Sequence, residues 1–357
     1  MKSANSLDLG NSSIEEMRRV ALESYGEQPD SSIDPVDQFY TRVVRVTRNR
    51  LSTENSISIE VANGDFAVFV LTSELREDRK RLSADRVANV EKGPQLAGHL
   101  WLVPSTLHSA GRRAFSGTTL GDAMDEIESL GLGNQPAIAI EFSKRTISFY
   151  PTGVEAEESV VRLEVGEEDL ESTPVLNLLE RFAEKFVVTP NCQESQIRTW
   201  LDGTNYIPVK AAEKNIQELL WLFLSSRLID NHKIEMEHTL RSGRVDIVIR
   251  KRMAAGLWKT SAAVELKVVR SFSSTGRPTP AAALVKHIAR GYKQIREYRK
   301  ELEATEGWLV TYDMRKIDAR GNDLYSPHSA AAVADELNLH LEALYGTADD
   351  YRDSCAA

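Results

Sequence analysis

Three side chains in the second half of the sequence have the types and the spacing that hydrolysis of a phosphodiester requires. Asp246 follows the tripeptide Gly-Arg-Val, and Glu265 and Lys267 lie two residues apart in the run Val-Glu-Leu-Lys-Val. Because alternate residues of a strand point to the same side, Glu265 and Lys267 are expected to share one face. If the strand that contains Asp246 turns back through 251–259 as a hairpin, Asp246 comes to lie beside Glu265.

Two carboxylates side by side repel each other, and a hard divalent cation with oxygen ligands relieves that repulsion. Mg²⁺ is the expected ion, and Mn²⁺ is expected to substitute for it. A lysine next to the cation can orient or deprotonate a bound water, or neutralise charge that grows on a phosphate. A Glu-x-Lys in a single strand is common on protein surfaces, so the surrounding elements decide how much weight it has.

Those elements are expected in the order helix, three strands, helix, strand. The segment 213–228 predicts a helix that is apolar on nearly every side and is therefore buried against a sheet. Strands are expected at 233–240, 245–249 and 262–269, and a loop rich in Ser, Gly and Pro follows. A long amphipathic helix comes next, and a strand at 308–312 closes the set. The apolar residues that mark the long helix are Leu284, Ile288, Tyr292, Ile295, Tyr298 and Leu302.

This order of elements and acidic residues resembles the PD-(D/E)XK nuclease superfamily, over the segment from Glu213 to about Lys316. The resemblance implies a restriction-endonuclease-like core. It also implies a metal held by Asp246, by Glu265 and by the backbone carbonyl of Leu266, with Lys267 as the lysine of the family motif. Val245 stands where the family name has proline, a departure that is common in the superfamily.

Two further features strengthen the resemblance. Members frequently carry a glutamate on the first helix, and this sequence offers Glu213 or Glu218. Glu213 lies at the end of the buried face and Glu218 on another stripe, which favours Glu213 as a further catalytic and metal-binding carboxylate and leaves the choice open. Gln294 and Tyr298 are similar in spacing to the Q-x-x-x-Y helix motif of RecB-like nucleases. By that analogy they would be catalytic residues that contact the lysine, the water or a phosphate.

The distribution of charge along the sequence affects which binding partner is expected. The formal net charge of −9 argues against nucleic acid when it is taken alone. The segment 211–316, however, holds 20 Lys and Arg against 12 Asp and Glu, a net +8, which leaves −17 for the remainder. A basic run is usually a solvated face, but here it coincides with the expected active module. We therefore expect DNA as the partner, with Arg244, Arg290 and Lys293 as contacts.

The remainder of the chain is expected to divide into a flexible arm at 1–37, a mixed β-rich domain at 38–172, a connecting helix and linker at 173–210, and a helical extension at 317–357. The overall class is α/β, or α+β for the whole chain. In the β-rich domain we expect strands at 40–46, 56–62, 66–71, 137–141 and 147–150 and one helix at 120–130. The connecting helix is expected from Pro174 to about Val187. No catalytic motif is visible before residue 211, so a regulatory or targeting role is expected there.

Other features of the sequence do not indicate a further catalytic site. Cys192 and Cys355 support neither a disulfide framework nor a zinc site. His232, His238 and His287 lack a partner at ligand spacing and are expected to be structural or exposed. The acidic stretch 155–171 could mimic DNA, although solubility explains it more simply. No run approaches the roughly 18 apolar residues of a membrane span, and no secretory signal is visible, so a cytoplasmic protein without a membrane partner is expected.

Two classes of function remain. The first is a Mg²⁺-dependent DNA endonuclease of prokaryotic restriction or antiviral defence, and on architecture alone it is similar to antiphage nucleases of the Shedu type. The second is a non-catalytic module of nuclease fold that binds nucleic acid. A nuclease of branched DNA in repair, or an RNase, is a further alternative. The complete acidic set with Lys267 favours the first class, and the sequence leaves homo-oligomerisation and the trigger open.

Overall fold

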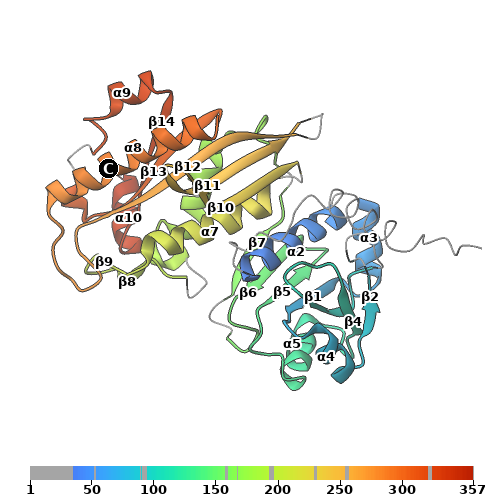
Figure 1. The fold of residues 1–357 in the computed structure, drawn as a ribbon. Helices are drawn as coiled ribbons and strands as arrows, with labels where there is room; N and C mark the ends of the chain where they lie inside the picture. Colours follow the sequence, from blue (N-terminus) through green and yellow to red (C-terminus); the bar gives the residue numbers. More distant parts are fainter. Residues whose placement is uncertain are drawn as a thin grey trace, which may run out of the picture.

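The computed structural model describes residues 35–51, 54–88, 90, 95–156, 160–166, 168–192, 197–228, 231–253, 257–320 and 324–356. Over these residues the protein is mixed α/β, and α+β as a whole, which confirms the expected class (Figure 1). Most of the arm expected at 1–37 lies outside the described residues. Its last three residues belong to helix α2 (Pro35–Leu51), so a helix begins within the segment that was expected to be an arm.

Seven strands form the N-terminal sheet, in the spatial order β2 (Asp85–Val87), β4 (Ala110–Ala114), β3 (His99–Val103), β1 (Phe66–Leu71), β5 (Ala137–Glu141), β6 (Thr146–Tyr150) and β7 (Val161–Glu164). β1 and β3 run parallel, and the other neighbours are antiparallel. The strands expected at 66–71, 137–141 and 147–150 are confirmed, as is the helix expected at 120–130, which is α5 (Leu120–Ser129).

Two segments expected as strands are helices. The predicted strand 40–46 lies within α2, and the predicted strand 56–62 lies within α3 (Glu54–Ala62). In α2 the buried residues recur at helical spacing, so packing of one helical face overrides the strand preference of its valines. These residues are Phe39, Tyr40, Arg42, Val43, Val44, Val46, Thr47 and Leu51. A further helix, α4 (Leu75–Arg81), was also not expected.

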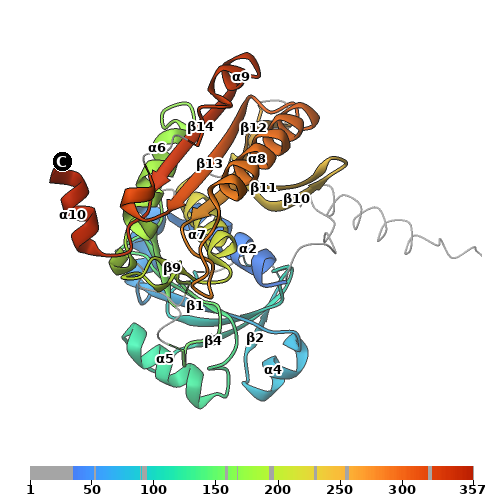
Figure 2. The same cartoon turned by 90° about the vertical axis from the view of Figure 1, so that its left-hand side faces the viewer.

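Successive residues of β1 pack into different cores. Ala67 and Phe69 face a core that includes α2, α6 (Val175–Phe182) and α7 (Ala212–Arg227). Val68 and Val70 face a second core beneath α4 and α5. The first core continues into the C-terminal sheet, and Figure 2 shows α2 and α7 between the two sheets. A helix in that place is buried on nearly all sides, which explains the apolar sequence of α7.

Five strands form the C-terminal sheet, in the order β10 (His232–Leu240), β11 (Gly243–Arg252), β12 (Trp258–Arg270), β13 (Glu306–Met314) and β14 (Leu337–Ala343). β10, β11 and β12 are antiparallel, whereas β13 pairs parallel with β12 and with β14. Helix α8 (Ala281–Glu301) contributes to a third core on the face opposite α7. The expected order of helix, three strands, helix and strand is confirmed.

The segment 317–357 was expected to be a helical extension, and this expectation is wrong in one respect. It contains the helical turn η4 (Ile317–Ala319) and the helices α9 (Ser329–Ala334) and α10 (Ala348–Ala356), but β14 lies between the two helices. β14 pairs with β13 along seven residues; it begins at the buried Leu337 and is followed by the buried Leu344. The sheet therefore extends beyond residue 316, because β13 without β14 would present an open edge.

The connection between the sheets contains the expected helix. α6 begins directly after Pro174 and continues as a π-helical turn, η2 (Ala183–Val187). A short 3-10 turn, η3 (Pro190–Cys192), and a small hairpin of β8 (Trp200–Asp202) and β9 (Ile207–Pro208) then lead to α7. Among the helices of the described segments, none has both the length and the apolar character needed to cross a membrane.

The role of β14 can be tested by truncation. Ending the chain after Lys316 should abolish folding or lower the free energy of unfolding by several kcal/mol, because burial of one leucine contributes roughly 2 kcal/mol and β13 loses its neighbour. Ending it after Thr347 removes only α10, which has no buried residue, and should leave the unfolding curve nearly unchanged. Chemical denaturation followed by circular dichroism measures both. Equal stability of the two fragments would contradict a structural role for β14.

Candidate active site

β11 and β12 separate at the place where the acidic residues gather. Their antiparallel ladder ends at the pair Ile247 and Val264, while β12 continues to Arg270. From that point the side of β12 that faced β11 has no strand beside it. Buried backbone N–H groups require acceptors, so other groups must take the place of the missing ladder.

Two carboxylates supply those acceptors. The backbone N–H of Leu266 donates to Asp246 Oδ2 at 2.7 Å, and the backbone N–H of Val268 donates to Glu213 Oε2 at 2.9 Å. Asp246 comes from β11 and Glu213 from the first turn of α7. The opening of the ladder therefore brings an aspartate and a glutamate to neighbouring positions along β12.

Glu265 and Lys267 lie together on β12, as strand alternation predicts. Lys267 Nζ donates to Glu265 Oε1 at 2.5 Å and to the carbonyl oxygen of Leu266 at 2.9 Å. Both side chains are buried, with 2% of Glu265 and 6% of Lys267 exposed. The side chain of Leu266 points the other way, into the core shared with α7.

α8 passes directly over the lysine at Gly291. A Cβ at this glycine would lie 3.0 Å from Lys267 Cγ and 2.8 Å from Leu309 Cδ1, so a side chain there would displace the lysine or the core. Gly291 was not among the residues expected at the site. A glycine inside a helix destabilises it by up to about 1 kcal/mol relative to alanine, so a glycine within this helical sequence pattern indicates a specific packing role.

Gln294 and Tyr298 contact each other rather than the lysine. Gln294 Nε2 donates to the Tyr298 hydroxyl at 3.2 Å, and Tyr298 is 1% exposed. A Cβ on Gly243, whose φ of +145° favours glycine, would lie 2.6 Å from that hydroxyl. The implied contact with Lys267 is not present among the described residues, because Lys267 donates to Glu265 and Leu266. Tyr298 instead packs against the start of β11.

The electrostatics of the site are dominated by burial. Burial raises the pKa of Asp246 to about 6, although the Leu266 N–H and the charge of Lys267 oppose the rise. Burial and the neighbouring charge of Asp246 raise the pKa of Glu265 to about 8, again against the effect of Lys267. Burial lowers the pKa of Lys267, but the charges of Glu265 and Glu213 outweigh it and the net direction is upward. The site therefore holds more negative charge than one ammonium neutralises.

Glu213, and not Glu218, faces this cluster. Glu213 Oε2 also lies 3.5 Å from His287 Nε2, whereas Glu218 forms an ion pair with Lys214 at 3.5 Å. Burial raises the pKa of Glu213, but His287, Lys267 and the Val268 N–H together hold it below its ordinary value. His287 was expected to be structural or exposed, and the structure places it at the site. Its position two helical turns before Gln294 was the available signal.

Gln217 is a second residue that the sequence analysis did not select. Its Nε2 donates to the backbone carbonyl of Asp246 at 3.0 Å and so links α7 to β11. It lies one turn after Glu213 on the same helix, and its polar side chain is buried within an apolar segment. A buried amide in such a segment needs a specific partner, which was the signal in the sequence.

The donor set fits a hard cation such as Mg²⁺. Glu265 Oε2 is buried and has no hydrogen-bond donor within the described part of the chain. Carboxylate oxygens and a backbone carbonyl are the ligands that Mg²⁺ prefers. Within the same residues, however, no three side chains of His, Cys, Asp or Glu already form a metal-binding group. Lys267 contacts Glu265 Oε1 and the Leu266 carbonyl, so a cation on those oxygens would compete with the ammonium.

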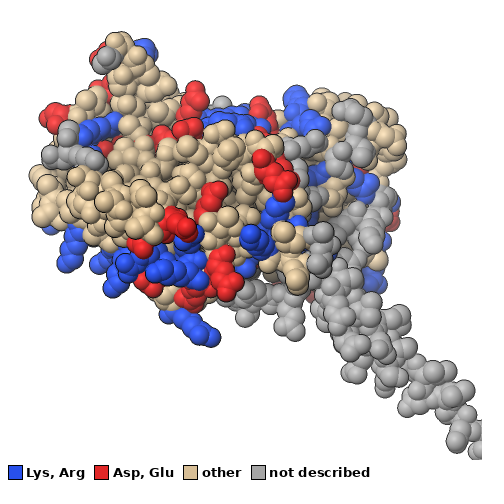
Figure 3. All heavy atoms as spheres, turned by 90° about the horizontal axis from the view of Figure 1, so that it is seen from above, with Lys and Arg blue, Asp and Glu red and all other residues tan. Residues whose placement is uncertain are grey.

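The three expected DNA contacts differ in their surroundings. Arg244 is 61% exposed in its side chain and pairs with Glu237 at 3.2 Å. Arg290 and Lys293 are exposed on α8 and have no ion-pair partner within the described segments. Figure 3 shows basic groups interspersed with acidic ones on the face that it draws, rather than one continuous basic surface. Arg290 and Lys293 are therefore better placed than Arg244 to attract phosphate.

The acidic stretch 155–171 is partly engaged by ion pairs with the C-terminal half. Asp169 lies 2.9 Å from Lys251 of β11, and Glu164 lies 2.9 Å from Arg227 of α7. Glu171 also pairs with Lys251, at 2.8 Å. In the described residues these carboxylates join the N-terminal half to the C-terminal half, a role that was not expected from the sequence.

Comparison of this chain with protein-family models, with curated proteins and with solved structures finds no match. The function of the site is therefore argued from its geometry and chemistry.

The raised pKa values predict how stability depends on pH in the absence of metal. The folded state holds protons on Asp246 and Glu265 that the unfolded state, with carboxyl pKa values near about 4, releases. The free energy of unfolding should therefore fall as the pH rises from about 5 to about 8, with the contribution of Glu265 lost last. Glu265→Gln should flatten this dependence by an amount on the order of a few kcal/mol. Denaturation in the presence of a chelator measures it.

Glu218→Gln is the matched control, because Glu218 pairs with Lys214 outside the site. This variant should keep the pH dependence of the wild type. A Glu265→Gln protein with the same slope as the wild type would show that Glu265 ionises freely, and that its burial has been overstated.

Proposed function

We propose that this protein is a metal-dependent nuclease that hydrolyses phosphodiester bonds in DNA. One observation carries the proposal: carboxylates from three elements gather around one buried lysine at the point where β11 and β12 separate. A structural ion pair would need one carboxylate for the lysine. The site has three, and two of them have a raised pKa, which favours a role that brings further positive charge.

Asp246, Glu265 and the Leu266 carbonyl would hold Mg²⁺, or Mn²⁺ in its place, and Glu213 would complete the acidic rim. When bound, such a cation polarises the scissile phosphate and lowers the pKa of a bound water. The backbone N–H groups of Leu266 and Val268 fix the orientation of two of the carboxylates before any ligand arrives. This preorganisation reduces the reorganisation that the reaction requires.

Lys267 is better suited to stabilise charge than to remove a proton. Burial alone would lower its pKa, but Glu265 and Glu213 raise it overall, so the ammonium persists at neutral pH. A protonated lysine cannot act as a base, whereas it can donate hydrogen bonds to a phosphate oxygen as negative charge develops. Gln294 and Tyr298, which contact each other on α8, would act as positioning residues only through the start of β11, against which Tyr298 packs.

The contact between Lys267 and the Leu266 carbonyl favours a second candidate function. The ammonium already satisfies two of the oxygens that a cation would use. A protein in which this contact is permanent would keep the nuclease fold and bind nucleic acid without cutting it. Cleavage assays at several Mg²⁺ concentrations separate the two functions, because only the nuclease depends on the metal.

The proposed biological setting is prokaryotic defence. A nuclease of prokaryotic defence, located in the cytoplasm and regulated by its N-terminal half, agrees with the architecture. The core that α7 shares with both sheets offers a route by which a change in one half could reach the other. The resemblance provides DNA as the substrate, and linear, circular, branched and RNA substrates should be compared directly.

Asp246→Asn should lower the rate of plasmid cleavage in Mg²⁺ by about a thousandfold or more, because a charged ligand is lost. The asparagine can still accept the Leu266 N–H, so folding should be preserved. Glu213→Gln should also reduce the rate, and Glu218→Gln, a matched change one turn further along α7, should not. Gel assays with purified, metal-replete proteins measure these rates. Near-normal cleavage by Asp246→Asn would overturn the assignment of the site.

Lys267→Ala should reduce the rate of the chemical step and leave DNA affinity nearly unchanged, since one buried lysine adds little to the attraction of phosphates. Arg290→Ala with Lys293→Ala should do the reverse. The double variant should weaken binding and reduce the slope of log affinity against log salt by up to about 2. Fluorescence anisotropy and single-turnover cleavage at saturating enzyme give the two readouts. Unchanged turnover of Lys267→Ala would place the chemistry elsewhere.

A further inference from the structure

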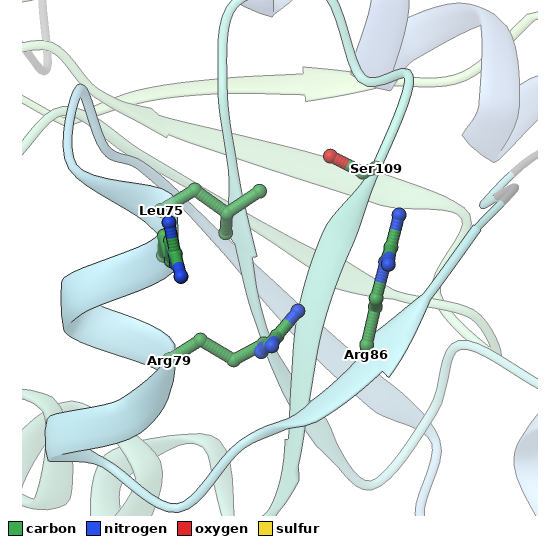
Figure 4. Close-up of a pocket in the computed structure, with 5 residues that line it drawn as sticks. Leu75, Arg79, Arg86 and Ser109 are labelled. Carbon is green, nitrogen blue, oxygen red and sulfur yellow. The ribbon is translucent and has the colours of Figure 1, made fainter.

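An open pocket of about 520 Å³ lies on the N-terminal sheet, between α4, β2 and the connection from β3 to β4. Its lining residues are Leu75, Arg76, Arg79, Arg86 and Ser109. In Figure 4 the guanidinium of Arg79, from α4, and that of Arg86, from β2, reach toward the same space, with Leu75 and Ser109 at its border. Arg76, Arg79 and Arg86 are called the pocket arginines below.

The pocket arginines differ from their neighbours in having no carboxylate partner among the described residues. Arg81, also on α4, donates to Asp78 at 2.9 Å. Arg113, on β4, lies 3.4 Å from Glu126. Three arginines around one pocket without an acidic partner form a local concentration of positive charge in a protein whose formal net charge is −9.

Two carboxylates of the same elements are directed elsewhere. Asp78 accepts hydrogen bonds from the hydroxyl of Thr72, at 2.5 Å, and from Arg81. Asp85, which precedes Arg86 in β2, lies 3.9 Å from Arg112. Neither of these carboxylates pairs with a pocket arginine, so the like charges that line the pocket favour a bound anion.

Arg79 is held in place before any ligand binds. A Cβ on Gly111 of β4 would lie 3.1 Å from Arg79 Cγ, so the aliphatic part of Arg79 rests on the strand where that glycine leaves room. This contact and the half-buried position of Arg79 restrict the rotamers of its side chain. A guanidinium that is already positioned loses less conformational entropy when it binds an anion.

We propose that this pocket binds the phosphate group of a small phosphorylated molecule of about nucleotide size. Guanidinium groups bind phosphate oxygens in pairs, and a phosphate monoester carries enough charge and enough acceptors for several arginines. The Ser109 hydroxyl can donate one more hydrogen bond. The volume is within the range of small-molecule sites and exceeds that of a phosphate, and Leu75 offers an apolar surface to the rest of the ligand.

This site lies on a different sheet from the candidate active site, and its assignment does not depend on nuclease activity. Isothermal titration calorimetry of the full chain tests it with inorganic phosphate, pyrophosphate, AMP and adenosine at matched ionic strength. AMP and pyrophosphate should bind, phosphate should bind more weakly, and adenosine should not bind. Absence of binding by all three phosphate probes at millimolar concentration would overturn the proposal.

Substitutions of single residues test whether the ligand binds in this pocket. Arg79→Ala and Arg86→Ala should each weaken the binding of AMP by about tenfold or more, since a charge-assisted hydrogen bond is lost. Arg79→Lys, which keeps the charge but loses the planar fork, should also weaken it. Lys80→Ala, a change of equal charge on the same helix outside the pocket, should not. Arg86 is exposed, so Arg86→Ala remains informative if Arg79→Ala fails to fold.

A DNA backbone offers phosphates too, so a short duplex is the competing ligand. If Arg79→Ala and Arg86→Ala weaken the duplex while AMP neither binds nor competes, the pocket is part of a nucleic-acid surface and the proposal is wrong. AMP affinity that is equal in the wild type, Arg79→Ala and Arg86→Ala would also overturn it. Competition of AMP with the duplex only in the wild type would support it.

Discussion

Two acidic side chains that are withdrawn from water next to each other are the feature on which the arrangement of the C-terminal half depends. Glu265 can be buried, with Asp246 half-buried beside it, only because β12 extends beyond its ladder with β11 and offers a backbone N–H and the ammonium of Lys267. Two helices complete this arrangement. α7 brings Glu213 to the next free N–H, and α8 has a glycine above the lysine. The order of helices and strands therefore provides the carboxylates with hydrogen-bond donors and an opposite charge in place of water.

The same constraint couples the two halves of the molecule. α7 carries Glu213 and Gln217 to the site, while its apolar residues belong to a core that also contains α2, α6 and one face of the N-terminal sheet. Ion pairs such as Asp169 with Lys251 add contacts at the margin of this core. A shift of α7 by a fraction of an ångström would alter the acceptor for the Val268 N–H. The first turn of α7 is therefore where packing in one half and chemistry in the other meet.

The parts of this arrangement that depend on regular periodicity could be predicted from the sequence. Alternation placed Glu265 and Lys267 on one face, and the helical patterns of α7 and α8 gave the order of the core. The errors arose where packing between distant segments decided the outcome. The valines of 40–46 are compatible with a strand until the sheet that buries one helical face is known, and 337–343 joins the sheet only because β13 has a free edge. His287 was expected to be structural or exposed because its partner lies on another helix.

The two sites also differ in the sign of their charge, and this difference affects which ligand each would bind. The candidate active site holds three carboxylates against one lysine, so an anion approaches it favourably only with a cation present, and attraction at longer range must come from Arg290 and Lys293. The pocket arginines need no such mediator. A small phosphorylated molecule would therefore bind at the N-terminal sheet, because near the acidic cluster it meets repulsion. A long polyanion can span the outer cations and reach the carboxylates with the metal. The opposite charges of the two sites would thus separate a small ligand from a polymeric substrate that carries the same phosphate chemistry.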